Sequence, residues 1–388
     1  MVHLSTSHTG GAGIAARRLH RELITAGVHS RFVALARESY LLKSNELEIK
    51  RTIFARTLGA VNSRVNILLN NKTYFTLWSV SAFRYKDLRK FGNPDTTIFH
   101  IHNWFNLLNI KDLENLLHAG YKIVFTLHDQ RLFTGGCHYS LDCKKFISGC
   151  KNCPLLPLPI NYMPSLNLRH IQKVFTRFAN QITIIAPSLW IKALALESNL
   201  CRDLRVVSIP NVHNNLETEG YHRIGHRPVN FKSSLIVGVA SVDKNSSLKG
   251  RDILIELANL IETGKQNIKI IYLSDYSAFK EAKNSFWNLI DYLIVPSVID
   301  NSPNVIHEAK SLGIPVIATN VGGIREVLNP LYDYIIDVNE NTSNLIFDLL
   351  NNMKKVPSKT DPKEIIKDYK NYSEDALEKI IKVYQGIL

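Results

Sequence analysis

The chain has 388 residues, of which 45% are hydrophobic and 21% charged, with a formal net charge of +13 and a pI of about 9.4. This composition excludes a disordered chain, and the length allows two domains with cores of their own. The sequence contains no run of about 18 apolar residues, and its first residues lack the basic and apolar regions of a signal peptide. We therefore expect a cytoplasmic protein.

The excess of positive charge favours anionic partners, such as nucleotide phosphates or an anionic inner-membrane surface. Lys and Arg are scattered along the chain, without a basic run or a nucleic-acid-binding motif. We therefore expect no nucleic acid partner. Peripheral contact of the first domain with the membrane is one interpretation of the charge, and improved solubility alone is the other.

The first half of the chain alternates predicted strands and helices. The expected strands are 2–6, 30–36, 97–103, 122–129, 182–188 and 206–212, and the expected helices are 14–27, 109–120 and 165–179. Residues 40–95 read as a helical and irregular insertion. Strands separated by helices predict a doubly wound parallel sheet, so residues 1–212 are expected to form a Rossmann-like domain.

A glycine-rich turn, Gly10 to Gly13, follows the first expected strand and opens the first helix. Amides at such a helix start can meet an anion. Counted from Gly11, the third glycine of a G-x-G-x-x-G pattern is replaced by Ala16, so only the looser dinucleotide fingerprint is met. Alone, the motif is equally well a tight strand-to-helix turn.

Polar side chains end two of these strands. His128 and Asp129 end one strand, and His100, His102 and Asn103 end the strand before it. The carboxyl ends of parallel strands are where α/β proteins place reactive side chains. These residues are therefore site candidates, with capping, ion-pair, core or turn roles as the alternatives.

Four of the five cysteines fall within 17 residues, in the pattern C-x5-C-x6-C-x2-C formed by Cys137, Cys143, Cys150 and Cys153. In a reducing compartment, four clustered thiolates suit tetrahedral zinc better than disulfides. We predict a structural zinc site in the loop 134–155, with His138 as a substitute ligand. Free thiols or an oxidised pair are the alternatives, and Cys201 is expected to be a lone buried thiol.

The second half begins after a polar stretch, 213–230, that is expected to be an inter-domain linker. A second Rossmann-like domain is assigned to 231–366, with strands at 234–241, 268–274 and 292–295 and helices at 251–264 and 278–290. Only one helix fits between the last two of these strands, so the domain is expected to be shortened. The tail, 367–388, is expected to be an amphipathic helix with Ser373 as a plausible N-cap.

Residues 291–327 carry the most specific pattern in the chain. A buried strand is followed by a polar turn, a helix expected at 305–312 and a further strand, VIAT. Asp300 on the turn and Glu308 on the helix can face one crevice. A helix start binds phosphate and carboxylates accept hydrogen bonds from hydroxyls, so the pattern indicates a nucleotide and a sugar. Carboxylates that merely cap a helix are the alternative.

The run Asp300-x7-Glu308 followed by EAKSLGIPVIATNVGG resembles the signature of retaining, family 4-type glycosyltransferases. The resemblance implies a GT-B fold: two Rossmann-like doubly wound parallel-sheet domains facing a cleft, with a C-terminal helix returning to the first domain. It implies that Glu308 holds ribose hydroxyls. It also implies that Asp300 and three helix-start amides meet the donor sugar and phosphates; these amides belong to Asn304, Val305 and Ile306. The family has glutamate where this chain has the shorter Asp300.

Lys249 stands before Gly250, between a strand and a helix, where a lysine can neutralise phosphate oxygens; a surface lysine beside a turn is the alternative. By the same resemblance, Lys249 acts on the donor diphosphate, with Lys244 as a weak assistant. His128 contacts the donor sugar or diphosphate. The glycine turn Gly11, Ala12 and Gly13 lies beside the diphosphate, and the acceptor-side candidates are His102, Asn103 and Asp129. The cysteine loop resembles one found in transferases that make bacterial surface polysaccharides.

The resemblance thus implies a retaining glycosyltransferase that moves a sugar from a UDP- or GDP-type donor to a hydroxyl of a glycan or lipid-linked glycan acceptor. Its expected catalytic residues are His128, Lys249 and Asp300, and no catalytic metal is expected. Capsule, exopolysaccharide or O-antigen assembly is the expected role. The shortened second domain motivates an alternative, a degenerate GT-B scaffold that binds glycan or a partner transferase. A nucleic-acid binder would rest on charge alone.

Overall fold

The structure of the protein is a computed structural model that divides into two compact units. Unit 1 comprises Met1–Val212 and Ala376–Leu388, and unit 2 comprises His213–Asp375. The structure describes residues 1–35, 45–49, 56–57, 59–61, 64, 75–76, 79, 81–82, 85–213, 234–240, 246–276, 280–355 and 361–387. Each unit has its own sheet and its own hydrophobic cores.

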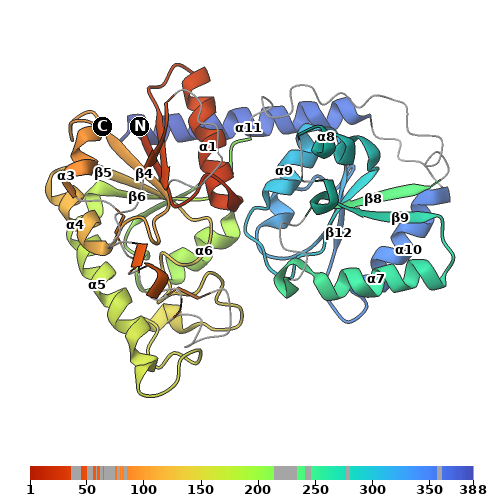
Figure 1. Ribbon diagram of the computed structural model, residues 1–388, viewed down its shortest axis with the longest axis horizontal. Coiled ribbons are helices and arrows are strands. Elements are labelled where there is room, and N and C mark those ends of the chain that lie inside the picture. Colours follow the sequence, from red (N-terminus) through yellow and green to blue (C-terminus); the bar gives the residue numbers. More distant parts are fainter. Residues whose placement is uncertain are drawn as a thin grey trace. The chain divides into compact units, whose positions relative to one another are not determined.

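The sheet of unit 1 has seven strands within the described ranges, all parallel, in the order β3-β2-β1-β4-β5-β6-β7 (Figure 1). The strands are β1 (Val2–Ser5), β2 (Arg31–Leu35), β3 (Glu46–Ile49), β4 (Ile98–Asn103), β5 (Lys122–Thr126), β6 (Ile182–Ala186) and β7 (Arg205–Ser208). The predicted doubly wound parallel sheet is confirmed. Strand β3 lies in the stretch 40–95, where only helical and irregular structure was expected. The sequence did not reveal it, because four residues are too few to show a clear alternation of apolar and polar side chains.

Helices cover both faces of this sheet. They are α1 (Gly10–Thr25), α3 (Tyr85–Leu88), α4 (Ile110–His118), α5 (Met163–Arg177), α6 (Leu189–Glu197) and the last turns of α11 (Pro362–Gln385). Alternate residues of β4 point to opposite faces. Ile98 packs with α1 and α11, whereas Phe99 and Ile101 pack with α4 and α5.

The sheet of unit 2 is also parallel and has five strands in its described part, in the order β12-β11-β10-β8-β9. The strands are β8 (Leu235–Val239), β9 (Ile268–Tyr272), β10 (Tyr292–Val295), β11 (Val316–Thr319) and β12 (Tyr334–Ile336), and the helices are α7 (Arg251–Thr263), α8 (Lys280–Leu289), α9 (Asn304–Ser311) and α10 (Thr342–Lys355). Helices α7 and α10 pack on one face, and α8 and α9 pack on the other. The described residues between β9 and β10 form a short 3-10 turn and α8.

Helix α11 corrects one expectation about the C-terminal segment. The helix begins at Pro362, so Ser373 lies inside it and is not an N-cap. Its Oγ accepts a hydrogen bond from the amide of His213 at 3.1 Å and donates to the His213 carbonyl at 3.0 Å. From Ala376 onward the helix belongs to unit 1, where Ile380 and Tyr384 join the core, so it returns to the first unit as expected.

Some sequence predictions fall on residues outside the described ranges. They include Lys244, all of the expected linker except its first residue, and most of the stretch 40–95. Within the described ranges, α6, α10 and β12 are elements that the sequence reading did not assign.

Candidate functional site

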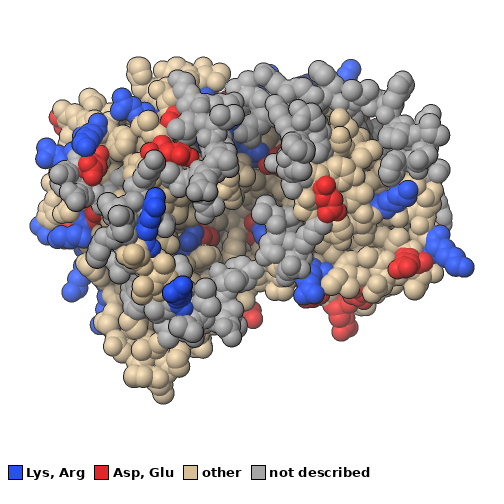
Figure 2. Space-filling model, in the orientation of Figure 1, with Lys and Arg blue, Asp and Glu red and all other residues tan. Residues whose placement is uncertain are grey.

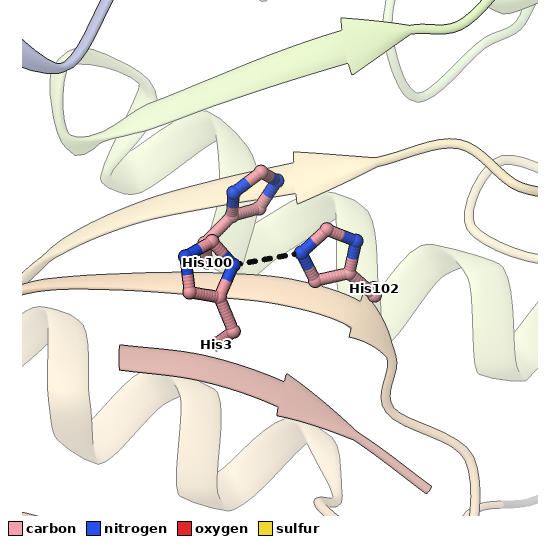
Figure 3. Close-up of side chains that lie close together, drawn as sticks. All are labelled: His3, His100 and His102. Carbon is pink, nitrogen blue, oxygen red and sulfur yellow. Dashed lines mark hydrogen bonds between the residues drawn. The ribbon is translucent and has the colours of Figure 1, made fainter. Parts of the chain in front are cut away.

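Three histidines, His3, His102 and His128, form a hydrogen-bonded chain across β1, β4 and the end of β5 in unit 1. Figure 3 shows the first two of them beside His100. His3 Nδ1 lies 3.0 Å from His102 Nε2, and His102 Nδ1 lies 3.0 Å from His128 Nε2. His100, on the same face of β4 as His102, is bound at Nδ1 by the Tyr384 hydroxyl (2.6 Å) and at Nε2 by the Thr126 hydroxyl (2.7 Å). The sequence identified the two histidines of β4 and the one that follows β5, but not His3.

The three hydrogen-bonded histidines, His3, His102 and His128, are held neutral at physiological pH. Burial lowers the pKa of His3 and His102 well below the usual range, and neighbouring histidines lower it further. Burial also lowers the pKa of His128 to about 4; Asp129 opposes this shift, and Arg131 adds to it. Each neutral ring carries one N–H, so the tautomer of one ring fixes the tautomer of the next.

The predicted acceptor-side residues meet at one hollow together with His128, which was predicted to contact the donor. His102, Asn103, Asp129 and His128 all line the same pocket at the carboxyl ends of β4 and β5. His102 and Asn103 belong to β4. His128 and Asp129 follow β5, which ends at Thr126 and not at Asp129 as expected. The structure therefore brings these four predicted residues together.

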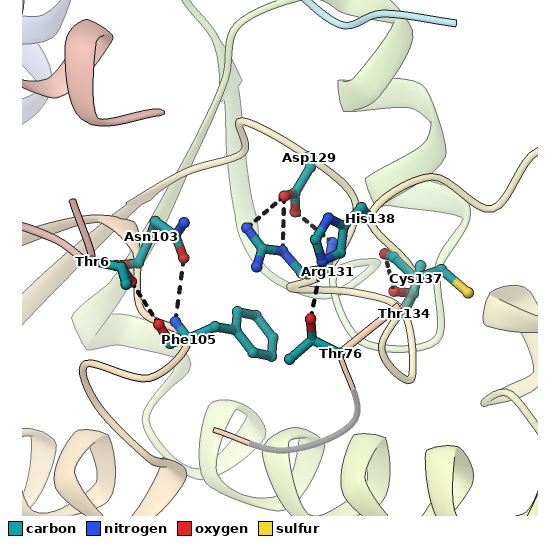
Figure 4. A network of polar contacts seen from close by, with 9 residues as sticks. All are labelled: Thr6, Thr76, Asn103, Phe105, Asp129, Arg131, Thr134, Cys137 and His138. Carbon is teal, nitrogen blue, oxygen red and sulfur yellow. Dashed lines mark hydrogen bonds and ion pairs between the residues drawn. The ribbon is translucent and has the colours of Figure 1, made fainter. Parts of the chain in front are cut away.

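Arg131 is a residue of this pocket that the sequence reading missed. Its Nε and Nη2 lie 2.8 and 2.7 Å from Asp129 Oδ2, and its guanidinium stands 4.7 Å from the centre of the Phe105 ring (Figure 4). The neighbouring guanidinium helps to lower the pKa of Asp129 against the opposing effect of burial. Asp129 is thus paired with Arg131, and its orientation of His128 remains a prediction. The sequence signal that could have identified Arg131 is its position two residues after the His128-Asp129 pair.

The glycine turn forms the first turn of α1, because the helix begins at Gly10, four residues before the expected start. A Cβ on Gly13 would lie 2.1 Å from the Ser7 carbonyl oxygen, so the close backbone approach requires glycine there. The segment before it is bound to the end of β4, since the amide of Thr6 donates to Asn103 O at 3.1 Å. Gly11, Ala12 and Gly13 therefore start a helix beside the strand that carries His102 and Asn103.

A larger hollow of about 360 Å³ adjoins this pocket in unit 1 and shares Trp104 and Phe105 with it. Its other lining residues are Ser79, Asn109, Ile110, Tyr162, Met163, Leu166, Asn167 and His170. The indole Nε1 of Trp104 is buried without a hydrogen-bond partner among the described residues. Aromatic walls with a few amide and imidazole groups are typical of sites for small polar ligands.

In unit 2, the structure brings Lys249 and Asp300 together. Lys249 Nζ lies 2.5 Å from Asp300 Oδ2; the lysine side chain is 41% exposed and the aspartate 7% exposed. Lys249 ends a 3-10 turn (Ser247–Lys249) directly before α7, and Asp300 lies on the loop between β10 and α9. Two residues predicted from separate motifs thus form one ion pair.

Two glycines let the loops close around this pair. Gly250 has φ +79°, and a Cβ there would lie 1.9 Å from the Pro296 carbonyl oxygen. Gly322 has φ +58°, and a Cβ there would lie 1.8 Å from the Asp300 carbonyl oxygen, which also accepts from the Gly323 amide at 3.0 Å. Any other residue at either glycine would push the loops apart. This role of Gly322 was not foreseen.

Helix α9 carries the remaining predicted donor residues. It starts at Asn304, with Pro303 in an extended conformation before it, so Asn304, Val305 and Ile306 form its first turn. Glu308 follows one turn into the helix and is half-buried. On the same helix, His307 is bound at Nε2 by the Ser302 hydroxyl (2.8 Å) and at Nδ1 by the Tyr369 hydroxyl (2.8 Å), which ties the site loop and α11 to α9.

The surface charge shows no dominant basic face in the view of Figure 2, where the described Lys and Arg residues alternate with Asp and Glu. Among the described helices, none combines the length and apolarity that crossing a bilayer requires.

Comparison with known proteins finds one match within unit 2 and others over most of the chain. Residues 239–352 match the family model "Glycosyl transferases group 1". The putative colanic acid biosynthesis glycosyl transferase WcaC of Escherichia coli K12 is 25% identical over 354 residues, covering 82% of each chain. The chain is therefore similar to group 1 glycosyl transferases over residues 239–352 and to a glycosyl transferase over most of its length.

Two solved structures share the fold over nearly the whole chain. HepE of Anabaena, solved in complex with UDP and glucose, gives a TM-score of 0.63 at 14% identity, covering 99% of both chains. Sucrose-phosphate synthase of Thermosynechococcus elongatus gives 0.63 at 13% identity, covering 100% of this chain and 98% of that one. The expected GT-B fold is confirmed.

Proposed function

We propose that this protein is a retaining glycosyltransferase that moves a sugar from a UDP- or GDP-type nucleotide-sugar to a hydroxyl of a glycan or lipid-linked glycan, in the assembly of a bacterial surface polysaccharide. The Lys249–Asp300 pair is the observation that carries the proposal, since it lies within the family-matched residues and at the start of α7. Similarity to a colanic acid transferase supports the polysaccharide role, and HepE with UDP supports the donor class. We place the protein at the cytoplasmic face of the membrane, where the +13 charge would favour anionic lipid.

In the proposed reaction, Lys249 and the first-turn amides of α9 bind the donor diphosphate. The bond from the sugar C1 to phosphate breaks, the acceptor oxygen bonds to C1, and the acceptor proton leaves with the nucleoside diphosphate. A cation and aligned amides stabilise the charge that develops on the leaving group. Glu308 binds the ribose hydroxyls, and Asp300 positions both Lys249 and the sugar. This division of roles requires no catalytic metal.

For the acceptor side we propose the two hollows of unit 1 that share Trp104 and Phe105. His102, Asn103, His128 and Asp129 line the smaller one, and Trp104 and Phe105 form the wall that it shares with the larger one. Aromatic faces pack against the apolar face of a sugar ring, while amide and imidazole groups bond its hydroxyls. This combination supports a glycan acceptor.

Calorimetric titration with a panel of UDP- and GDP-sugars tests the donor class, followed by donor hydrolysis measured as release of free nucleoside diphosphate. We expect saturable binding and turnover for at least one donor. Binding without turnover would favour the degenerate scaffold. Absence of binding to every nucleotide-sugar would contradict the enzyme proposal.

A further inference from the structure

An uncharged, apolar segment leads into helix α5 on the surface of unit 1. Residues 154–166, here called the apolar tip, read PLLPLPINYMPSL and contain no charged side chain. Three of its large side chains face solvent: Leu158 is 81% exposed, Tyr162 50% and Leu166 48%. Figure 1 shows the segment in yellow-green at the N-terminal end of α5, and this lower end of unit 1 is free of blue and red in Figure 2.

The exposed side chains of the apolar tip belong to one short piece of backbone. Tyr162 directly precedes α5 and Leu166 lies in its first turn, four positions later, so both lie on the same side of the helix. A 3-10 turn (Ile160–Tyr162) joins them to Leu158. Single exposed apolar residues are normal on a protein surface, whereas a group of them marks a surface that binds something.

The chain on both sides of the apolar tip carries positive charge and no negative charge. No Asp or Glu occurs from residue 143 to residue 196, although the whole chain has 34 of them, whereas seven Lys and Arg residues fall in this stretch. Five of these cations are exposed and have no carboxylate partner within the described ranges: Lys144, Lys151, Arg169, Lys173 and Arg177. Glu114 of α4, which lies near His170, pairs with Lys111 at 3.1 Å. The surroundings of the apolar tip are therefore basic.

Helix α5 continues the apolar tip with a basic stripe formed by Arg169, Lys173 and Arg177. Together with Leu166 these exposed residues recur every three or four positions, so they lie along one side of the helix. The buried residues of α5 lie on the other side and pack into the core of unit 1. Arg169 and Lys173 stand about 4.5 and 10.5 Å from Leu166 along the helix axis. This is about the distance over which an anionic surface attracts a cation at physiological salt.

We propose that the apolar tip and the basic stripe dock this protein on an anionic lipid bilayer. The exposed side chains of the tip enter the boundary between headgroups and acyl chains, and the cations of the stripe meet lipid phosphates. Segments that lie on a membrane surface combine these two contributions, buried apolar area and attraction to anionic lipid. A second copy of the chain fits this surface less well, because two copies would bring their unpaired cations together.

Docking through the apolar tip brings the larger hollow of unit 1 to the bilayer surface. Three residues of the tip, Tyr162, Met163 and Leu166, also line that hollow. An acceptor bound there can enter from the bilayer, which favours a lipid-linked glycan over a free glycan. This choice of acceptor rests on the proposed function, whereas the docking itself does not.

Vesicle flotation without any sugar donor tests the docking independently of transferase activity. The full-length chain is expected to bind vesicles of phosphatidylcholine and phosphatidylglycerol in equal parts at least about tenfold more tightly than vesicles of phosphatidylcholine alone. The double substitution Leu158→Ser and Tyr162→Ser should weaken this binding at least about tenfold, because it removes apolar area that enters the bilayer. Leu331→Ser is the matched control: this leucine is 84% exposed in unit 2, and its loss should leave binding unchanged.

A second pair of variants separates the basic stripe from the overall charge of the chain. Arg169→Gln with Lys173→Gln should weaken binding to the anionic vesicles at least about tenfold. Lys363→Gln with Lys367→Gln removes the same charge from exposed positions of α11 and should keep binding within a few-fold of wild type. Circular dichroism verifies that all variants remain folded.

Three results would overturn the docking proposal. One is equal binding to the two kinds of vesicle or none to either, and another is an equal loss in the α5 and α11 variants. The third is a dimer in sedimentation velocity that dissociates when Leu158 and Tyr162 are replaced, because the apolar tip would then bind a second copy of the chain. Vesicle binding by a chain that binds no nucleotide-sugar would contradict the enzyme proposal and support the docking surface.

Discussion

Lys249 and Asp300 show how a single ion pair can organise the proposed donor site. Each residue was a candidate from its own motif, and the structure places Lys249 Nζ 2.5 Å from Asp300 Oδ2. The pair holds a half-exposed lysine at the start of α7, where a diphosphate can reach it. The motif spacing predicted both residues, but their contact depends on loops that approach only because Gly250 and Gly322 lack side chains.

Replacing Lys249 should slow donor turnover far more than it weakens the fold. We expect Lys249→Gln to lower the rate of nucleotide-sugar hydrolysis at least about 100-fold, because a group that stabilises leaving-group charge contributes that much or more. The measurement is release of nucleoside diphosphate at saturating donor. Lys265→Gln, two residues beyond the opposite end of α7, is the matched control and should keep the wild-type rate.

Glu308→Ala, by contrast, is expected to act on donor binding, because its predicted partners are the ribose hydroxyls. Calorimetry should show a large loss of affinity for the nucleotide-sugar and for the free nucleoside diphosphate. Circular dichroism would verify that both variants remain folded. Turnover of Lys249→Gln within a few-fold of wild type, or nucleotide-sugar affinity of Glu308→Ala within a few-fold of wild type, would contradict the role assigned to that residue.

At the scale of elements, helix α9 is anchored from beneath by a buried ion pair. Lys310 Nζ bonds Asp333 Oδ2 with both side chains almost fully buried, and Asp333 Oδ1 accepts from the Val316 amide at 2.9 Å. Burial lowers the pKa of Lys310 to about 8, and the Asp333 carboxylate opposes this shift. The pair links the end of α9, the start of β11 and the loop before β12. The sequence predicted only a helix here, and nothing in its local pattern indicated that this lysine faces the core.

Lys310→Met should destabilise unit 2 strongly, because it leaves Asp333 buried without its counter-ion. A loss of about 3–5 kcal/mol is typical of breaking such a pair. Urea unfolding followed by circular dichroism measures it. The exposed pair of Lys370 and Glu374, 3.7 Å apart, provides the control: Lys370→Met should change stability by less than about 1 kcal/mol. Equal effects of the two substitutions would contradict this account.

At the scale of the whole molecule, the buried histidines should make unit 1 sensitive to acid. The folded pKa values of His3, His100 and His102 lie well below the unfolded value of about 6.5, so the unfolded chain binds more protons as the pH falls. Their contribution to stability is complete above about pH 6.5 and declines as the pH falls toward the folded values. Each unit of pKa shift corresponds to about a tenfold change in the unfolding equilibrium.

Hydrogen exchange at pH 7.5 and pH 5, corrected for the intrinsic rate, would measure this loss strand by strand. Protection of β1 and β4 should fall about tenfold or more at the lower pH, whereas β10 and β11 in unit 2 provide the internal comparison. Unchanged protection of β1 and β4 would show that these histidines are not held neutral by burial.

The sequence by itself determined the two parallel α/β units and most of the residues of the proposed site. Runs of apolar residues fix buried strands, and the motif from Asp300 to Gly323 and the Lys249–Gly250 step are local patterns in the chain. Such features are visible because they depend on neighbours in sequence.

Only the tertiary structure decided which of these residues meet. The chain from His3 to His128 joins residues 99 and 26 positions apart, and Arg131 has a role only because Asp129 and Phe105 lie beside it. Helix α11 begins at Pro362, well before the expected N-cap, and Ser373 inside it bonds the backbone of His213 instead. These contacts arise from the order of the strands and the path of the loops, which no local pattern of apolar and polar residues encodes.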